Sequence, residues 1–159
     1  MAINLIPNQW KTGHLVVKDS TAADIPELIQ VQVACAYMEE WSGWKYMKEL
    51  AGWKQDDHPE QSTLTFITEG ELPPNGSKEF WRVQSLRLSD TGQMIGFLAV
   101  YHGLPTANFV YVNYLLIHPD FQGQGYGQEL VRGLCDQVKS LGYTGMRTLV
   151  DVKNWPTSG

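Results

Sequence analysis

The segment Gln122-Gly123-Gln124-Gly125-Tyr126-Gly127 separates two stretches of different periodicity. The run from Phe109 to Ile117 is rich in β-branched and aromatic residues, as is typical of a strand, and His118-Pro119 ends it. The sequence therefore predicts a strand, a glycine-rich turn and a helix. The apolar residues that show the helical spacing after the turn are Leu130, Leu134, Val138 and Leu141.

A glycine-rich turn that opens a helix is a binding site for anions. Glycines let the backbone approach a ligand closely, and the first N–H groups of a helix have no partner within it. The helix dipole adds about half a positive charge at the same place. We therefore expect residues 122–127 to bind a ligand that carries phosphate.

The spacing of the glycines narrows the choice of ligand. A Walker loop requires Lys-Ser or Lys-Thr after the last glycine, and neither follows here. A dinucleotide fingerprint requires a glycine where Gln128 stands. The pattern Q-x-x-G-x-G over Gln122, Gly125 and Gly127, preceded by Leu115-Leu116-Ile117-His118-Pro119, resembles the acetyl-CoA-binding segment of the GNAT superfamily of N-acetyltransferases.

The resemblance implies a function and a set of binding residues. The backbone amides of Gln122, Gly123, Gln124, Gly125, Tyr126 and Gly127 would hold the pyrophosphate of coenzyme A. Those of Leu115, Leu116 and Ile117 would hold the pantetheine arm and the thioester carbonyl, and Asn154 would bond the pantetheine amide. The implied reaction is direct transfer of an acetyl group from the cosubstrate acetyl-CoA to a primary amine of a small molecule or a peptide.

The rest of the chain fits an α/β fold of this kind. The patterns predict a mixed, mostly antiparallel central sheet flanked by helices, in the order β-α-α-β-β-β-α-β, as a single domain over residues 1–159. Residues 54–78 are predicted to be a long loop, with a short strand at 64–67. The predicted strands are 14–18, 80–88, 93–102, 109–117 and 144–152, and the predicted helices are 25–36, a short one within 37–53, and 125–141.

The resemblance also implies a further helix and a final hairpin after residue 152, which the chain of 159 residues does not contain. Three explanations stand: a truncated sequence, completion by a partner subunit, or a naturally short variant. We favour truncation. Without the further helix and hairpin, one edge of the strand 144–152 would be exposed, and exposed sheet edges pair with other chains. We therefore predict either a homodimer that covers this edge or a protein of low solubility with a mobile C-terminus.

The catalytic groups are less directly indicated. Many members of the superfamily place a glutamate on the strand before the glycine loop, but this chain has Tyr111, Asn113 and Tyr114 there. We therefore predict that Asn113 or Tyr114 holds a water molecule that relays the amine proton. Further candidates for the base, each with a surface or structural role as the alternative, are Glu39, Glu40, His102 and His118.

The segment 37–53 is the candidate acceptor site, since substrates of the superfamily enter beside the first helices. Trp41, Trp44 and Trp53 with two glutamates would suit a cationic amine, although core packing is the alternative that we favour.

The composition of the chain limits the classes of partner and the cellular location that we expect. A net charge of −5 argues against nucleic acid and permits cationic substrates. No run is long enough to cross a membrane and no secretion signal opens the chain, so we expect a cytoplasmic protein. Cys35 and Cys135 show no metal or redox spacing, and no metal is expected. A CoA-binding module without catalysis, acting as a sensor or a partner subunit, is the rival function, because the strand lacks a carboxylate.

Overall fold

The computed structural model describes residues 4–36 and 58–148. In this part of the chain, six strands form one sheet in the order β1-β2-β3-β4-β5-β6. Neighbouring strands are antiparallel, except that β5 and β6 are parallel. The elements are β1 (Gln9–Lys11), β2 (Leu15–Asp19), η1 (Ala22–Asp24), α1 (Ile25–Ala36), α4 (Pro59–Thr68), η2 (Lys78–Phe80), β3 (Trp81–Leu88), β4 (Met94–His102), β5 (Phe109–Ile117), η3 (Pro119–Phe121), α5 (Tyr126–Ser140) and β6 (Gly145–Thr148).

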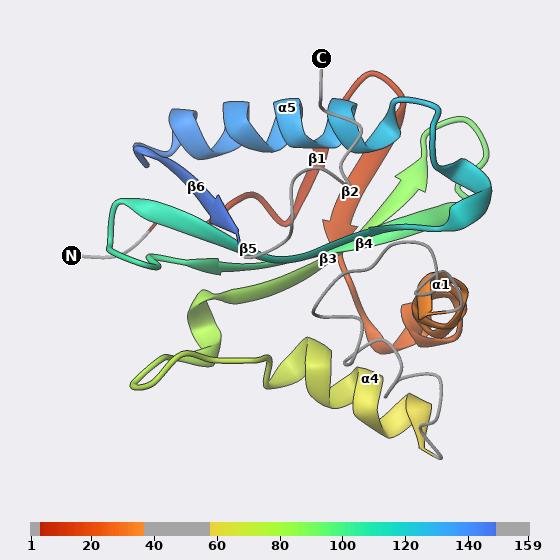
Figure 1. The fold of residues 1–159 in the computed structure, drawn as a ribbon, viewed down its shortest axis with the longest axis horizontal. Helices are drawn as coiled ribbons and strands as arrows, with labels where there is room; N and C mark the ends of the chain where they lie inside the picture. The colour runs from red at the N-terminus through yellow and green to blue at the C-terminus, as the bar shows by residue number, and fades with distance from the viewer. Residues whose placement is uncertain (1–3, 37–57, 149–159) are drawn as a thin grey trace.

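Helices cover both faces of the sheet. Figure 1 shows α5 along one face and α1 with α4 beneath the other. Each face has its own apolar cluster: one contains Leu130, Leu134 and Val138 of α5, and the other contains Leu28 and Val31 of α1. The prediction of a mixed, mostly antiparallel sheet flanked by helices is confirmed.

Local signals explain the elements that the sequence predicted well. Helix α1 has the predicted bounds, because Thr21 and Asp24 form a capping box immediately before it and Pro26 suits its first turn. Strands β3 and β4 form the predicted hairpin, which closes through a hydrogen bond from Gly92 N to Leu88 O (2.8 Å). Helix α5 buries the predicted apolar stripe.

Two predictions from the sequence are wrong. The predicted loop over 54–78 contains helix α4, and its proposed strand at 64–67 lies within that helix. Pro59 occupies the first turn of α4, while Phe66 and Ile67 pack on the apolar cluster beneath the sheet, so one face of the helix is covered. Strand β1 was not predicted, because it has three residues and buries only Trp10.

Strand β6, which is the first part of the predicted strand 144–152, lies beside β5. Phe109 pairs with Gly145 and Val112 with Thr148 in a parallel register. The remainder of the predicted strand, 149–152, lies outside the described residues, as does the short helix predicted within 37–53.

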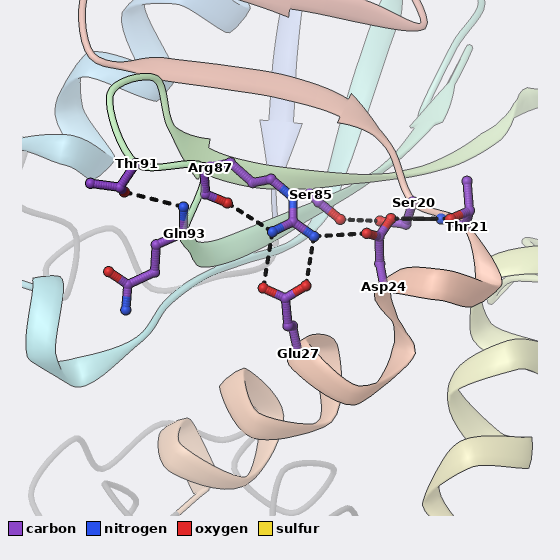
Figure 2. Close-up of polar contacts among 9 residues, drawn as sticks. Ser20, Thr21, Asp24, Glu27, Ser85, Arg87, Thr91 and Gln93 are labelled. Carbon is purple, nitrogen blue, oxygen red and sulfur yellow. Dashed lines mark hydrogen bonds and ion pairs between the residues drawn. The ribbon is translucent and has the colours of Figure 1, made fainter.

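A partly exposed cluster of ion pairs fixes α1 to the sheet (Figure 2). The Arg87 guanidinium on β3 donates to both carboxylate oxygens of Glu27 (2.8 and 2.9 Å), to Asp24 Oδ1 (2.8 Å) and to Gly92 O (2.9 Å). This bidentate pairing lowers the pKa of Glu27 and raises that of Arg87. The first turn of α1 is therefore tied to the β3–β4 hairpin.

Candidate functional site

The glycine loop presents bare backbone at the start of α5. Gly123 and Gly125 have φ of +77° and +87°, a conformation that side chains disfavour. A Cβ atom at either position would meet nothing within 4 Å, so the loop surface is open. The first helical hydrogen bond runs from Glu129 N to Gly125 O (2.9 Å), which leaves the N–H groups of residues 126–128 without a partner inside the helix.

The two glutamines of the loop brace it from within. Gln122 Nε2 donates to Ile117 O (2.8 Å), and Gln124 Nε2 donates to Asp120 O (3.1 Å). These amides are therefore engaged with the loop's own backbone. The capacity of the loop for an anion lies in its backbone N–H groups and the helix dipole.

Strand β5 carries a bulge at Asn113, just before the loop. Ala99 of β4 pairs with Tyr114, whereas the next residue, Val100, pairs with Val112, so Asn113 is the extra residue. The bulge changes which face the side chains occupy: Val112 packs in the cluster beneath α5, and Tyr114 packs in the cluster of α1. The Asn113 Oδ1 atom is buried and has no hydrogen-bond partner within the described part of the chain.

Beyond the bulge, the backbone N–H and C=O groups of successive residues of β5 point alternately toward β4 and away from it. His118 N donates to Ile95 O (2.7 Å), which fixes this alternation. The amide of Leu116 is therefore used in the ladder with β4, while the backbone groups of Leu115 and Ile117 point to the other side. Among the described strands, β6 covers that side only along residues 109–112.

A tyrosine and a glutamate meet on the α4 face of this strand. The Tyr114 hydroxyl donates toward the carboxylate of Glu71, with distances of 2.8 and 3.0 Å to its two oxygens. Tyr114 is 7% exposed, and its ring lies edge-on to Phe66 of α4 (centroids 5.6 Å apart). Sequence reasoning missed Glu71, since 43 residues separate it from Tyr114 and no local pattern marks it.

The comparisons with known proteins agree with this architecture. A model of the acetyltransferase (GNAT) family matches residues 44–156, well over half of the chain. The chain belongs to the GNAT acetyltransferase family. The resemblance inferred from the loop is thereby confirmed, and membership implies acetyl transfer that depends on an acyl-CoA.

Solved structures share this fold. A GNAT family acetyltransferase from Staphylococcus aureus has a TM-score of 0.56 at 13% identity, covering 92% of this chain and 94% of its own. The PaiA N-acetyltransferase of Thermoplasma acidophilum, solved in complex with coenzyme A, has a TM-score of 0.52 at 16% identity, covering 79% and 73%.

A ribosomal-protein-alanine N-acetyltransferase from Brucella melitensis has a TM-score of 0.54 at 12% identity, covering 87% of this chain and 83% of its own. At these identities the likeness to solved structures shows the fold alone. A comparison with curated protein sequences found no significant match.

The histidines considered as bases have structural roles in this GNAT domain. His102 is 1% exposed, accepts from Ile6 N at Nε2 (3.1 Å) and donates from Nδ1 to Phe80 O (2.8 Å). Burial lowers the pKa of His102 to about 4. His118 caps η3, where its Nδ1 accepts from Asp120 N (3.1 Å). Both ring nitrogens of His102 and the Nδ1 of His118 are thus engaged with backbone groups.

A second cluster at the start of α5 was not predicted. The Glu129 carboxylate accepts from Thr12 Oγ1, from His14 N (2.7 Å) and from His14 Nδ1 (2.7 Å). Although burial alone would raise it, these hydrogen bonds lower the pKa of Glu129, and the same contact raises the pKa of His14. The β1–β2 turn is therefore fastened beside the glycine loop.

Several predicted site residues lie outside the described residues. They are Glu39, Glu40, Trp41, Trp44, Trp53 and Asn154. Within residues 4–36 and 58–148, no group of three His, Cys, Asp or Glu side chains could hold a metal ion. The described helices include none long and apolar enough to cross a membrane.

Proposed function

We propose that this chain is an N-acetyltransferase that moves the acetyl group of acetyl-CoA to a primary amine of a small molecule or peptide. The observation that carries the proposal is the open loop of Gly123 and Gly125, whose conformation exposes the first amides of α5. Membership of the GNAT family makes coenzyme A the phosphate ligand that suits such a loop.

The backbone after the bulge suits the rest of the cosubstrate. Acetyl-CoA, when bound, supplies an activated thioester. The backbone N–H groups of Leu115 and Ile117, which point away from β4, would donate to the pantetheine arm and polarise the carbonyl. The buried Oδ1 of Asn113, which has no partner among the described residues, is a ready acceptor for an N–H group of the ligand or for an ordered water. In this assignment Leu116 contributes packing, because its amide is engaged with β4.

Tyr114 is the side chain on this strand that we propose to assist the proton transfer. Tyr114 lies just beyond Val112, the last residue of β5 that pairs with β6, and its side chain packs in the cluster of α1 and α4. A phenol there can hold a water or pass a proton between the acceptor amine and a stronger base.

Direct binding tests the loop assignment. We expect saturable acetyl-CoA binding by calorimetry, and a loss of at least tenfold in affinity in Gly125→Val, because a side chain would obstruct the amides and strain the turn. Gly92→Val is the matched control, since Gly92 also has a positive φ (+77°) and open space but lies in the β3–β4 hairpin. Equal affinity in both variants and the wild type would refute the assignment.

Turnover distinguishes the enzyme from a CoA-binding module without catalysis. The lack of a carboxylate on β5 favours the module, and the contact of Tyr114 with Glu71 favours the enzyme. Release of free CoA thiol is measured with cadaverine, lysine methyl ester and a peptide that begins with alanine. Binding of acetyl-CoA without release of thiol in any of these reactions would support the module.

The remaining proposals concern the location of the protein in the cell and its partners. We propose a cytoplasmic protein without a nucleic-acid or membrane partner, on the net charge of −5 and the short apolar runs. The homodimer stays a prediction. It is motivated by β6, which is the last strand in the order of the described sheet.

A further inference from the structure

The contact between Tyr114 and Glu71 joins two parts of the chain that the sequence keeps apart. Glu71 follows α4 on an exposed segment, while Tyr114 is the first residue after the bulge of β5. The hydroxyl lies within 3.0 Å of both carboxylate oxygens. The phenol is therefore oriented by a carboxylate at its hydroxyl end and by Phe66 along its ring.

A buried phenol needs a hydrogen-bond partner, and a backbone carbonyl would serve that need without charge. Trp81 on the same face is satisfied in this way, since its Nε1 donates to Phe66 O (2.8 Å). Tyr114, which belongs to the stretch of β5 that β6 does not cover, instead has a carboxyl group as its partner. The contact therefore brings a proton-accepting group to the side chain of this stretch of β5.

Glu71 supplies the carboxyl group of this contact. The other titratable side chains of the same apolar cluster, within the described residues, are Cys35 on α1, Tyr101 on β4 and Tyr111 on β5. Burial raises the pKa of Cys35 to about 12 and also raises that of Tyr111. The ordinary pKa values of thiols and phenols in general also lie above about 7. Glu69, two residues earlier, instead faces Lys78 Nζ at 3.7 Å.

We propose that Glu71 is the carboxylate base of the transfer, taking a proton from the acceptor's ammonium group, with Tyr114 as its positioning residue. The inference rests on the proposed transferase function. It supplies from a loop the carboxylate that β5 lacks. A cationic amine that approaches the thioester along this face would be attracted by the Glu71 charge before it is deprotonated.

The proton and bond balance is complete with the groups named. Glu71 accepts one proton from the ammonium, and the freed amine nitrogen forms a bond to the acetyl carbon as the carbon–sulfur bond breaks. The nitrogen then loses a second proton, and the leaving CoA thiolate gains one to become the thiol. The products are the amide, CoA thiol and one proton, which Glu71 returns to solvent.

Glu71→Gln tests the base, because glutamine keeps the size of the side chain and an oxygen for the Tyr114 hydroxyl but cannot take the proton. With the amine that the wild type acetylates best in the panel above, we expect kcat to fall by about 10²–10⁴. The acidic limb of the kcat/KM profile should disappear, and acetyl-CoA affinity should stay within about twofold. Glu69→Gln is the matched control, expected to behave as the wild type.

Tyr114→Phe tests the positioning role. It keeps the ring against Phe66 and removes the hydroxyl, so a folded protein with a shifted acidic limb and a smaller loss of kcat is expected. Activity of Glu71→Gln within threefold of the wild type, with an unchanged pH profile, would overturn this assignment and leave the transferase proposal standing. Failure of the wild-type chain to release thiol would overturn both.

Discussion

Gly96 marks the place where the sheet leaves no room for a side chain. A Cβ atom there would lie 2.1 Å from Leu116 O on the neighbouring strand. Leu116 belongs to the stretch of β5 that leads into the glycine loop. Gly96 thus allows the close approach of β4 and β5 that holds this stretch in position.

Gly96→Ala should destabilise the protein by about 1–3 kcal/mol or more, because the backbone of β5 has to move away. Gly145→Ala is the control: it is also a strand glycine, but its Cβ would meet Phe109 at an ordinary 3.6 Å. Chemical denaturation of both variants compares the free energies of unfolding. If the two variants had the same free energy of unfolding, β4 and β5 could move apart without a loss of stability, and the prediction would be wrong.

His102 predicts a pH dependence of stability. Its folded pKa, about 4, lies below the ordinary value of 6.5, so the unfolded chain binds more protons between these values. The contribution of neutral His102 is therefore fully present above about pH 6.5 and is lost as the pH falls toward 4, by about 3 kcal/mol at most.

Denaturation from pH 7 to 4 measures this loss. His102→Gln can still donate to Phe80 O and accept from Ile6 N, but it does not titrate. We expect the variant to be less stable at pH 7 and to show a shallower decline toward pH 4. An equal slope in the two proteins would assign the decline to other groups.

At the scale of elements, the sequence correctly predicted the helices and strands that are marked by residues close to their ends. The capping box before α1 and the glycines that bound the β3–β4 turn and α5 lie within a few residues of the elements they define. Helix α4 has such a signal in Pro59, but its short apolar run near Phe66 is compatible with either a strand or a helix, and only packing beneath the sheet decides between them.

The same distinction separates the parts of the candidate site. The loop from Gln122 to Gly127 could be predicted because strand, turn and helix are contiguous. The bulge at Asn113 could not, since it depends on the register with β4. The Glu71 contact depends on how α4 and the segment after it pack on β5, which no spacing in the sequence records.

The attachment of α1 to the sheet depends on Arg87. Arg87→Ala removes all of its hydrogen bonds to Glu27 and Asp24 and leaves the two carboxylates adjacent, so we expect a loss of about 1–3 kcal/mol at pH 7. Exposed Arg132→Ala on α5 is the control and should be nearly neutral.

The pH dependence identifies the cause. Because Arg87 lowers the folded pKa of Glu27 below its ordinary 4.5, this stabilisation is present above that value and is lost as the pH falls through the folded pKa. The free energies of unfolding of Arg87→Ala and the wild type should therefore converge as the pH falls below 4.5 and through the folded pKa of Glu27. A constant difference across this range would indicate lost packing by the arginine stem instead.

At the scale of the whole molecule, the candidate site lies where the two apolar clusters meet. Strand β5 contributes to both, since Val110 and Val112 pack in the cluster of α5, Tyr114 and Leu116 pack in the cluster of α1 and α4, and its C-terminal end leads into the loop before α5. A ligand held by the loop and by the backbone of β5 would therefore bind a strand that packs against the helices on both faces of the sheet (Figure 1).

Acetyl-CoA should accordingly stabilise the folded chain as a unit. At a concentration 100 times its Kd, a ligand that binds only the folded state adds about 2.7 kcal/mol, which for a domain of this size raises Tm by about 5–10 °C. ADP lacks the pantetheine arm, so it should reproduce only part of the shift, and Gly125→Val should abolish most of it. Differential scanning calorimetry at matched ligand concentrations measures these shifts. If ADP alone gave the full shift, the groups of Leu115 and Ile117 would make no contact with the ligand, and the loop would be a site for nucleotides in general.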